Sequence, residues 1–274
     1  MHQENSEKQT DTLSSAQCMR HSLAHLLAAA VMEMWPNTKR TIGPAIDNGF
    51  YFDFEFETPI TQEDLPKIEK KMRQILPSWT TFERSELSKE EAKKEFEGNE
   101  FKCELIDEFS SEGQTLTFYK SGNYWDLCRG GHVDNMKAEI DPKSFKLSKL
   151  AGAYWRGSEK NPQLTRIYGL AFETPEELDA YLKMMEEAER RDHRKLGKEL
   201  EIFMLSEEVG AGLPLWLPNG ATIVEELEKL GKQVEFDGGY SRVRTPHITK
   251  GSLYHKSGHL PYYAETMFPP MVMA

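Results

Sequence analysis

Two pairs of side chains with the same four-residue spacing could do chemistry in this chain. His21 and His25 lie in a segment that has almost no other polar side chains, and Cys128 and His132 repeat their spacing much later. Three imidazoles and a thiol can bind a zinc ion tetrahedrally, or they can orient a water molecule with a histidine as the general base. Both chemistries point to hydrolysis, and the spacing alone does not separate them.

The local sequence around each pair indicates how the two pairs can meet. From His21 to Met32 the chain carries no formal charge and is apolar nearly all round, which is typical of a helix surrounded by protein. Side chains four residues apart share one face of such a helix, and buried imidazoles need partners. Cys128 and His132 are separated by an arginine and two glycines, a sequence typical of a turn. We therefore predict that both pairs converge on one site.

Three other assignments compete for roles at this site. Lys102 lies in the segment 100–106, whose alternating apolar residues predict a strand, and this pattern alone places the lysine on the outer, solvated face. Asp126 could orient a histidine or a lysine, or it could simply cap a turn at the end of a strand. Cys128 could itself be a nucleophile, with His132 as its base.

The first part of the chain predicts an α+β domain with an antiparallel sheet wrapped around a central helix. Ser14 and Gln17 form a capping-box sequence, and the helix that they begin should end at Pro36. A tight-turn sequence at 47–49 precedes alternating phenylalanines and acids at 52–56, which indicates a strand with one buried face. Further helices are predicted at 63–76 and 88–97, and further strands at 100–106, 115–120 and 164–172.

The rest of the chain, from Pro175 on, differs in composition and in its predicted elements. Pro175 begins a helix that is predicted to run to about Leu200 and that ends with basic residues. These residues are Arg190, Arg191, Arg194, Lys195 and Lys198. Cations are favoured at a helix C-terminus in any case, and the functional alternative is contact with RNA phosphate. A glycine- and proline-rich stretch at 210–220 then leads to an amphipathic helix and a strand-like segment at 240–244.

Composition limits the classes of function. The 274 residues carry a net charge of −11, so a nucleic-acid partner would require a local basic patch. No apolar run reaches membrane-spanning length, and we expect no membrane partner. The three cysteines are far apart, which does not indicate a disulfide framework and is consistent with a reducing cytoplasm.

Several sequence blocks are specific when they are taken together and in order. They are Arg20–Leu27, Ile42–Pro44, Asp47–Tyr51, Asp126–His132, Ala151–Gly157 and Arg191–Lys198. This set resembles the threonyl-tRNA synthetases of the bacterial type, and the resemblance covers nearly all of the chain after residue 17. It implies a disordered tail at 1–16, an editing domain at 17–173, a linker helix at 174–200 and, at 201–274, a truncated start of a class II aminoacylation domain.

The resemblance implies that the editing domain hydrolyses seryl-tRNA(Thr) made in error. Serine lacks one methyl group of threonine, and one methyl group supplies only about 1–3 kcal/mol of discrimination, so a second selective pocket is needed. The editing residues implied by matching position are His21, His25, Lys102, Asp126, Cys128 and His132. Lys102 thereby becomes an expected contact of the ester or the terminal ribose. Phe52 stands where the family commonly has a tyrosine, which leaves the role of that hydroxyl to another group.

The resemblance also bears on cofactors and partners. It implies that editing requires no metal, and the alternative is zinc held by His21, His25, Cys128 and His132, because the related alanyl-tRNA editing family holds zinc with a similar set. The expected partner is the aminoacylated 3′ end of tRNA(Thr), and tRNA contact becomes the favoured role of the basic residues at 190–198. ATP, magnesium and the zinc of the full enzyme would bind outside this chain.

The segment 201–274 is expected to contain class II motif 1, formed by a helix at 220–236 and a strand leading to Pro246. In the full enzyme this motif would build a homodimer interface. Two rival interpretations remain: a zinc hydrolase that acts on another aminoacyl ester, and a tRNA-binding, dimerising chain whose site is inert because of Phe52. Metal content and the response to mischarged tRNA would separate them.

Overall fold

The computed structural model describes residues 14–269 and 271, and within them the chain forms two compact units. The first unit extends to Glu189 and the second begins at Arg190. Most of the predicted tail, residues 1–13, lies outside the described residues, whereas Ser15 already belongs to the first helix. Within the described residues, no helix is long and apolar enough to cross a membrane.

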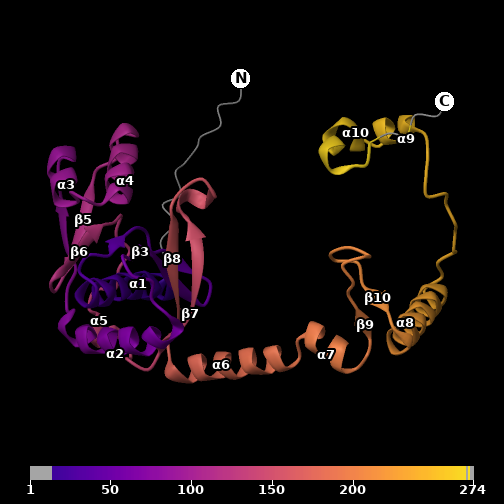
Figure 1. Ribbon diagram of the computed structural model, residues 1–274, viewed down its shortest axis with the longest axis horizontal. Helices are drawn as coiled ribbons and strands as arrows, with labels where there is room; N and C mark the ends of the chain where they lie inside the picture. The colour runs from indigo at the N-terminus through magenta and orange to yellow at the C-terminus, as the bar shows by residue number, and fades with distance from the viewer. Residues whose placement is uncertain (1–13, 270, 272–274) are drawn as a thin grey trace. The chain divides into compact units, whose positions relative to one another are not determined.

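Helix α1 (Ser15–Met34) is the centre of the first unit (Figure 1). The predicted capping box is confirmed: the Ser14 hydroxyl accepts a hydrogen bond from the Gln17 backbone, and the Gln17 side chain accepts one from the Ser14 backbone. The apolar residues from Leu23 to Val31 are all buried, as their distribution around the helix predicts. Strands β2 (Ala45–Ile46), β3 (Gly49–Glu55) and β8 (Gln163–Ala171) and helix α2 (Leu65–Ile75) pack against α1, so the helix is surrounded by protein.

The main sheet is antiparallel and five-stranded, with the order β1-β3-β8-β7 and with β2 paired to β3. Its strands are β1 (Lys39–Arg40), β2 (Ala45–Ile46), β3 (Gly49–Glu55), β7 (Phe145–Tyr154) and β8 (Gln163–Ala171). The predicted turn at 47–49 connects β2 and β3, and Asn48 there has a positive φ of 64°. The expectation that β3 buries only one face is wrong, because Asp53 is also buried and forms a bidentate ion pair with Arg166.

A second antiparallel sheet lies in the same unit. It contains β4 (Glu83–Glu86), β5 (Thr117–Ser121) and β6 (Tyr124–Leu127) in that order, with α3 (Lys89–Glu95) and α4 (Glu100–Ser111) beside it. The strand predicted at 100–106 is wrong, because these residues form the first half of α4. Asn99 caps this helix by accepting a hydrogen bond from the Lys102 backbone at 3.2 Å. The remaining helices of the unit are α2 (Leu65–Ile75), α5 (Met136–Glu139), most of α6 (Pro175–Arg190) and the 3₁₀ turns Gln62–Asp64, Leu76–Ser78 and Trp155–Gly157.

The single helix predicted over 174–200 is instead two helices. Helix α6 ends at Arg190, and α7 (His193–Glu199) begins after Asp192, whose side chain accepts a hydrogen bond from the Arg194 backbone at 2.8 Å. An aspartate in this position starts a new helix rather than continuing the old one. The strand-like segment 240–244 forms no strand. The other elements of the second unit are β9 (Phe203–Met204), β10 (Leu215–Trp216), α8 (Pro218–Asp237), α9 (Gly251–Lys256), α10 (His259–Tyr262) and the 3₁₀ turn Ala264–Thr266.

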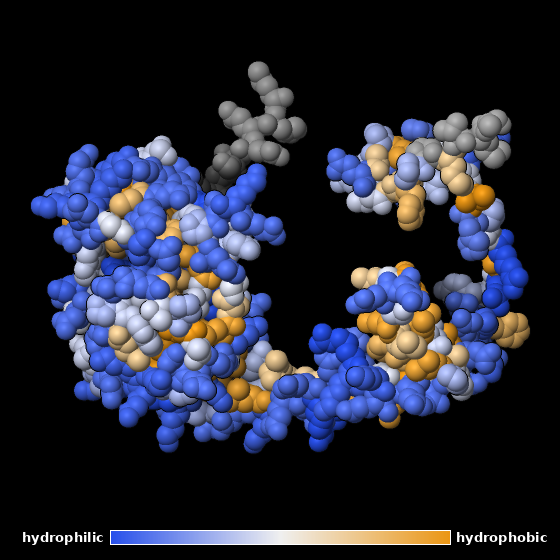
Figure 2. All heavy atoms as spheres, viewed as in Figure 1, coloured by the Kyte–Doolittle hydropathy of each residue, from blue (hydrophilic) through white to orange (hydrophobic). Residues whose placement is uncertain are grey.

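The amphipathic helix predicted in the second unit is confirmed as α8, but its apolar face is exposed. Ile223, Leu227, Leu230 and Val234 are each between 45% and 63% exposed. Hydrophobic side chains gather over α8 and the β9–β10 hairpin in the space-filling view (Figure 2). The fold class is α+β with antiparallel sheets, as predicted, and the helix at the centre of the first unit carries two of the six expected site residues, His21 and His25.

Gly49→Ala is expected to destabilise the first unit by about 1–3 kcal/mol, because a Cβ atom there would lie 2.0 Å from the carbonyl oxygen of Gly169 in the paired strand. Denaturant unfolding followed by circular dichroism measures the change. Gly231→Ala is the control, because a Cβ atom at this position in α8 meets no atom within 4 Å and alanine favours a helix. If both variants were equally stable, the close approach of β3 and β8 would be contradicted.

Candidate active site

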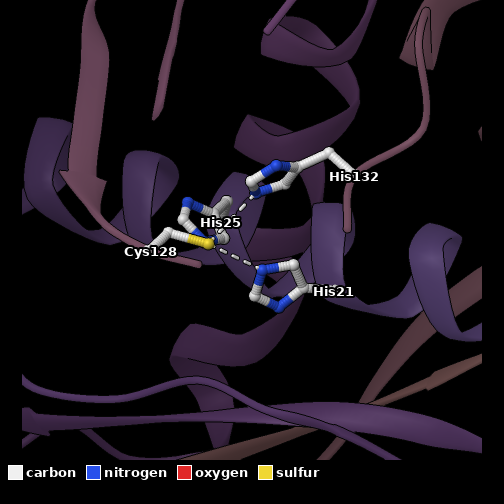
Figure 3. A group of neighbouring side chains, drawn as sticks. All are labelled: His21, His25, Cys128 and His132. Atoms are coloured by element: carbon white, nitrogen blue, oxygen red, sulfur yellow. Dashed lines mark hydrogen bonds between the residues drawn. The ribbon is translucent and has the colours of Figure 1, made fainter. Parts of the chain in front are cut away.

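The predicted convergence of the two pairs is confirmed (Figure 3). His21 and His25 project from α1, and Cys128 and His132 lie on the segment that follows β6. The Nε2 atom of His21 is 3.0 Å from the sulfur of Cys128, and the Nε2 atom of His132 is 3.7 Å from the same sulfur. The four potential ligand atoms all lie within 4.8 Å of one another.

Burial makes the three histidines neutral. Desolvation lowers the pKa of His132 to about 3, and it lowers the pKa of His25 well below the usual value, with repulsion from the neighbouring imidazoles adding to the effect. The His132 ring stacks on Phe82 with a centroid distance of 4.1 Å, and its Nδ1 atom has no hydrogen-bond partner among the described residues. Neutral imidazoles offer lone pairs, which can accept a proton or bind a metal.

Cys128 is held in the turn that its sequence predicts. Gly130 and Gly131 have φ values of 93° and 86°, which glycine adopts without strain. The Gly130 backbone donates a hydrogen bond to the Cys128 sulfur at 3.2 Å. Burial raises the pKa of this thiol to about 11, so the thiol is protonated at neutral pH, and this does not favour the nucleophile assignment.

A buried ion-pair network lies beside the four groups. The Lys102 ammonium is 2.7 Å from a carboxylate oxygen of Asp126, and both side chains are almost fully buried. The expectation from pattern alone that Lys102 faces solvent is wrong, because α4 turns this side chain inward. Tyr124 donates a hydrogen bond to the other carboxylate oxygen of Asp126 at 2.8 Å. Burial alone would raise the pKa of Asp126, but Lys102 and Arg40 outweigh it and hold the pKa below its usual value.

Arg40 is a member of this network that the sequence analysis did not identify. Its Nε atom lies 3.5 Å from Asp126, and its Nη2 atom donates to the Trp125 carbonyl at 3.0 Å. Its backbone carbonyl accepts a hydrogen bond from Asn99, the cap of the helix that carries Lys102. No motif in the sequence signals this role, because Arg40 lies outside the recognisable blocks and in a strand of only two residues.

These groups surround a cavity of about 370 Å³. Of the six predicted site residues, all except His132 line it. Its other walls are mostly apolar, formed by Ile42, Gly43, Pro44, Phe52, Leu105, Phe109 and Leu127, with Arg129 and Gly130 completing the lining. Phe52 packs directly on Gly43, where a Cβ atom would lie 2.1 Å from the ring. A cavity of this size, with a few convergent polar groups, is typical of a small-molecule site.

The four clustered groups also fit a zinc ion by chemistry and approximate spacing. Tetrahedral zinc with bonds of about 2.0–2.3 Å requires ligand atoms about 3.3–3.8 Å apart. The separation of 3.7 Å from His132 to the Cys128 sulfur lies within this range, the separation of 3.0 Å from His21 would have to widen, and the widest separation of 4.8 Å would have to contract. A zinc held by all four of these groups would be fully ligated and structural, whereas a zinc that supplies Lewis acidity would need one of the four positions to stay open for water.

The predicted tRNA-binding residues all belong to the second unit, whereas the cavity belongs to the first. Arg190 is the last residue of α6 and Arg191 follows it, while Arg194, Lys195 and Lys198 lie on α7. Arg194 forms an ion pair with Asp192 at 2.6 Å, so part of its charge is already compensated.

Comparison with known proteins defines the class of this site. Residues 116–168 match the family described as the threonyl and alanyl tRNA synthetase second additional domain, and this segment contains Asp126, Cys128 and His132. The chain therefore carries a domain of the kind that these synthetases contain.

The homology extends over nearly all of the chain. The chain is 50% identical over 259 residues to the threonine–tRNA ligase of Dehalococcoides mccartyi, and 50% identical over 254 residues to that of Borrelia hermsii. These matches cover 94% and 93% of the chain. The chain is thus a homologue of the threonine–tRNA ligases. It spans 44% and 43% of the length of these two relatives, which is less than half.

Asp126→Asn is expected to destabilise the first unit by about 3–5 kcal/mol, because it leaves two buried cations without their carboxylate. Lys102→Met should cost less, because Asp126 keeps Arg40 as its partner. Denaturant midpoints of the two variants test this order. The reverse order would show that Arg40 does not compensate the carboxylate.

Proposed function

We propose that the first unit hydrolyses seryl-tRNA(Thr), releasing serine and free tRNA. The observation that carries this proposal is the convergence of His21, His25 and Cys128 with the Lys102–Asp126 pair around one cavity. The homology to threonine–tRNA ligases and the matched domain supply the substrate class. Threonine–tRNA ligases must reject serine, and an additional hydrolytic pocket provides the missing selectivity.

The proposed reaction is attack of water on the carbonyl carbon of the aminoacyl ester. A neutral imidazole of His21 or His25, the two histidines that line the cavity, accepts a proton from the water as it attacks. The bond between the carbonyl carbon and the ribose oxygen then breaks. The same imidazole returns its proton to that oxygen, which leaves as a hydroxyl group. The Lys102 ammonium, fixed by Asp126, is placed to interact with the ester or the terminal ribose.

We infer that this reaction does not require a metal, with zinc as the second candidate mechanism. In the metal-free mechanism the Cys128 sulfur is hydrogen-bonded to the His21 ring at 3.0 Å, and both groups orient the water and the ester directly. The observation that favours zinc is the clustering of four ligand atoms within 4.8 Å. In that case the chain would be a zinc-dependent aminoacyl-ester hydrolase.

The remaining assignments are part of the same proposal. Residues 17–173 act as the editing domain, 174–200 as a linker, and 201–274 as the start of a class II aminoacylation domain with α8 in motif 1. The exposed apolar face of α8 supports a role in homodimerisation, which sedimentation measurements can test. The basic residues at 190–198 bind tRNA, which binding measured at increasing salt can test. Such a protein would act in the cytoplasm, and fractionation of cells tests this location.

The chain is expected to deacylate seryl-tRNA(Thr) at least about tenfold faster than threonyl-tRNA(Thr), because one methyl group is the feature that the pocket must exclude. Release of labelled amino acid, measured with and without a chelator, tests both specificity and metal use. Unchanged activity in the chelator supports the metal-free mechanism, whereas loss that zinc restores establishes the zinc mechanism. Equal turnover of the two esters would remove the specificity claim, and no turnover of either would favour a tRNA-binding chain.

His25→Ala is expected to slow seryl-tRNA(Thr) hydrolysis by about 10²–10⁴-fold, the usual contribution of a general acid–base group. Single-turnover rates at saturating enzyme measure this step. His255→Ala is the matched control, because His255 lies on α9 in the second unit, outside the proposed tRNA-binding segment, and is exposed, so it should keep the full rate. A wild-type rate in His25→Ala would exclude this residue from the chemistry.

A further inference from the structure

The active-site cavity concentrates positive charge in a chain whose net charge is −11. Two of its lining residues, Lys102 and Arg129, are cationic, and Asp126 is the single acidic residue among those that line it. Arg40, just behind the wall, shares that carboxylate. An apolar cavity with an excess of cations focuses an attractive potential for anions. The charged side chains that line the cavity therefore leave a net positive charge there, which favours an anionic group of a ligand.

Arg129 is the member of this group whose charge is not used inside the protein. Lys102 is bound to Asp126 and almost fully buried, whereas Arg129 is exposed. The Arg129 guanidinium lies over the Phe109 ring, 4.7 Å from its centroid, and donates to the Gln114 side chain at 2.8 Å. These contacts hold the planar group without neutralising it.

Glu108 is the carboxylate that interacts electrostatically with Arg129, and it already forms an ion pair with Arg156. A guanidinium has five N–H donors, and one hydrogen bond to Gln114 leaves several for a ligand.

We propose that Arg129 binds the phosphodiester on the 5′ side of the ribose that carries the ester. This inference rests on the proposed function. Arg129 follows Cys128 directly in the chain and lines the same cavity, so it is adjacent to the point where the ester is hydrolysed. In a 3′-terminal nucleotide only the sugar ring separates the esterified hydroxyl from the 5′ phosphate. The guanidinium fork matches two phosphate oxygens, and its stacking on Phe109 pre-organises it for that contact.

This contact has a defined kinetic consequence. The phosphate does not change during ester hydrolysis, so Arg129 binds the ground state and the transition state equally. Such uniform binding lowers KM and leaves kcat unaffected. The residue is thus a binding residue, distinct from the histidines that move protons.

The test combines a change in the protein with a change in the substrate. The substrate is a CCA trinucleotide esterified with serine, made either with its natural phosphodiester before the terminal adenosine or with a neutral methylphosphonate at that position. In the wild-type chain the neutral linkage should raise KM about tenfold, because it removes a charge-assisted hydrogen bond. In Arg129→Gln the natural substrate should show the same loss, and the neutral linkage should add little to it.

Two further variants make the test independent of folding. Arg129→Lys keeps the charge without the fork and should fall between the wild type and Arg129→Gln, with thermal melting recorded for each protein. Lys160→Gln is the control, because it removes the same charge from an exposed position that does not line the cavity, and it should retain the full response to the neutral linkage.

The outcomes separate this inference from the proposed function. If the wild type hydrolyses the natural ester but Arg129→Gln still responds tenfold to the neutral linkage, the phosphate contact is overturned and the hydrolase stands. If the wild type hydrolyses neither ester, the proposed function fails and the phosphate contact falls with it. Loss in kcat alone would also overturn the proposal, because it would place Arg129 in the chemistry rather than in binding.

Discussion

The site depends on one buried carboxylate. Asp126 binds Lys102 from α4 and Arg40 from β1 and accepts a hydrogen bond from Tyr124, so three segments of the chain meet at its two oxygens. Each of these groups would be costly to bury alone, and together their opposite charges compensate one another. The same network fixes the position of the cavity wall next to Cys128, because Asp126 and Cys128 are separated by one residue.

Around this charged anchor, the other site groups are kept neutral by burial. The histidines have lowered pKa values and the Cys128 thiol has a raised one, so the ammonium and the imidazoles have distinct roles in one small cavity. Neutral imidazoles can accept protons, and the fixed cation can stabilise negative charge. The difference in charge between Lys102 and the histidines follows from their neighbours. Lys102 has a carboxylate beside it, whereas the histidines contact one another, a thiol and an aromatic ring.

Sequence patterns anticipated this site where spacing and local chemistry decide the structure. An uncharged helix predicts that His21 and His25 are buried on one face, and the glycines before His132 predict a turn. The turn and the burial of His25 are confirmed, whereas His21 is half-buried. The position of Lys102 could not be derived in this way, because apolar residues at 101, 103 and 105 follow the two-residue period of a strand, whereas the segment forms a helix that buries Phe101, Lys102 and Ile106. The Asn99 side chain, which accepts a hydrogen bond from the Lys102 backbone, stabilises the start of a helix at this point. Arg40 could not be found at all, because its partners are remote in the sequence and its burial depends on tertiary packing.

The site is divided between two sheets. His21 and His25 belong to the helix inside the main sheet, whereas Cys128, Asp126 and Lys102 belong to the small sheet, the segment after it and its helices. The small sheet has a minor core of its own, but Tyr124 of β6 packs in the main core, and the Val133 backbone donates a hydrogen bond to the Ser22 hydroxyl of α1 at 3.0 Å. The distances from the histidines to the Cys128 sulfur therefore depend on the packing of both cores, so a substitution remote from the cavity can change its geometry.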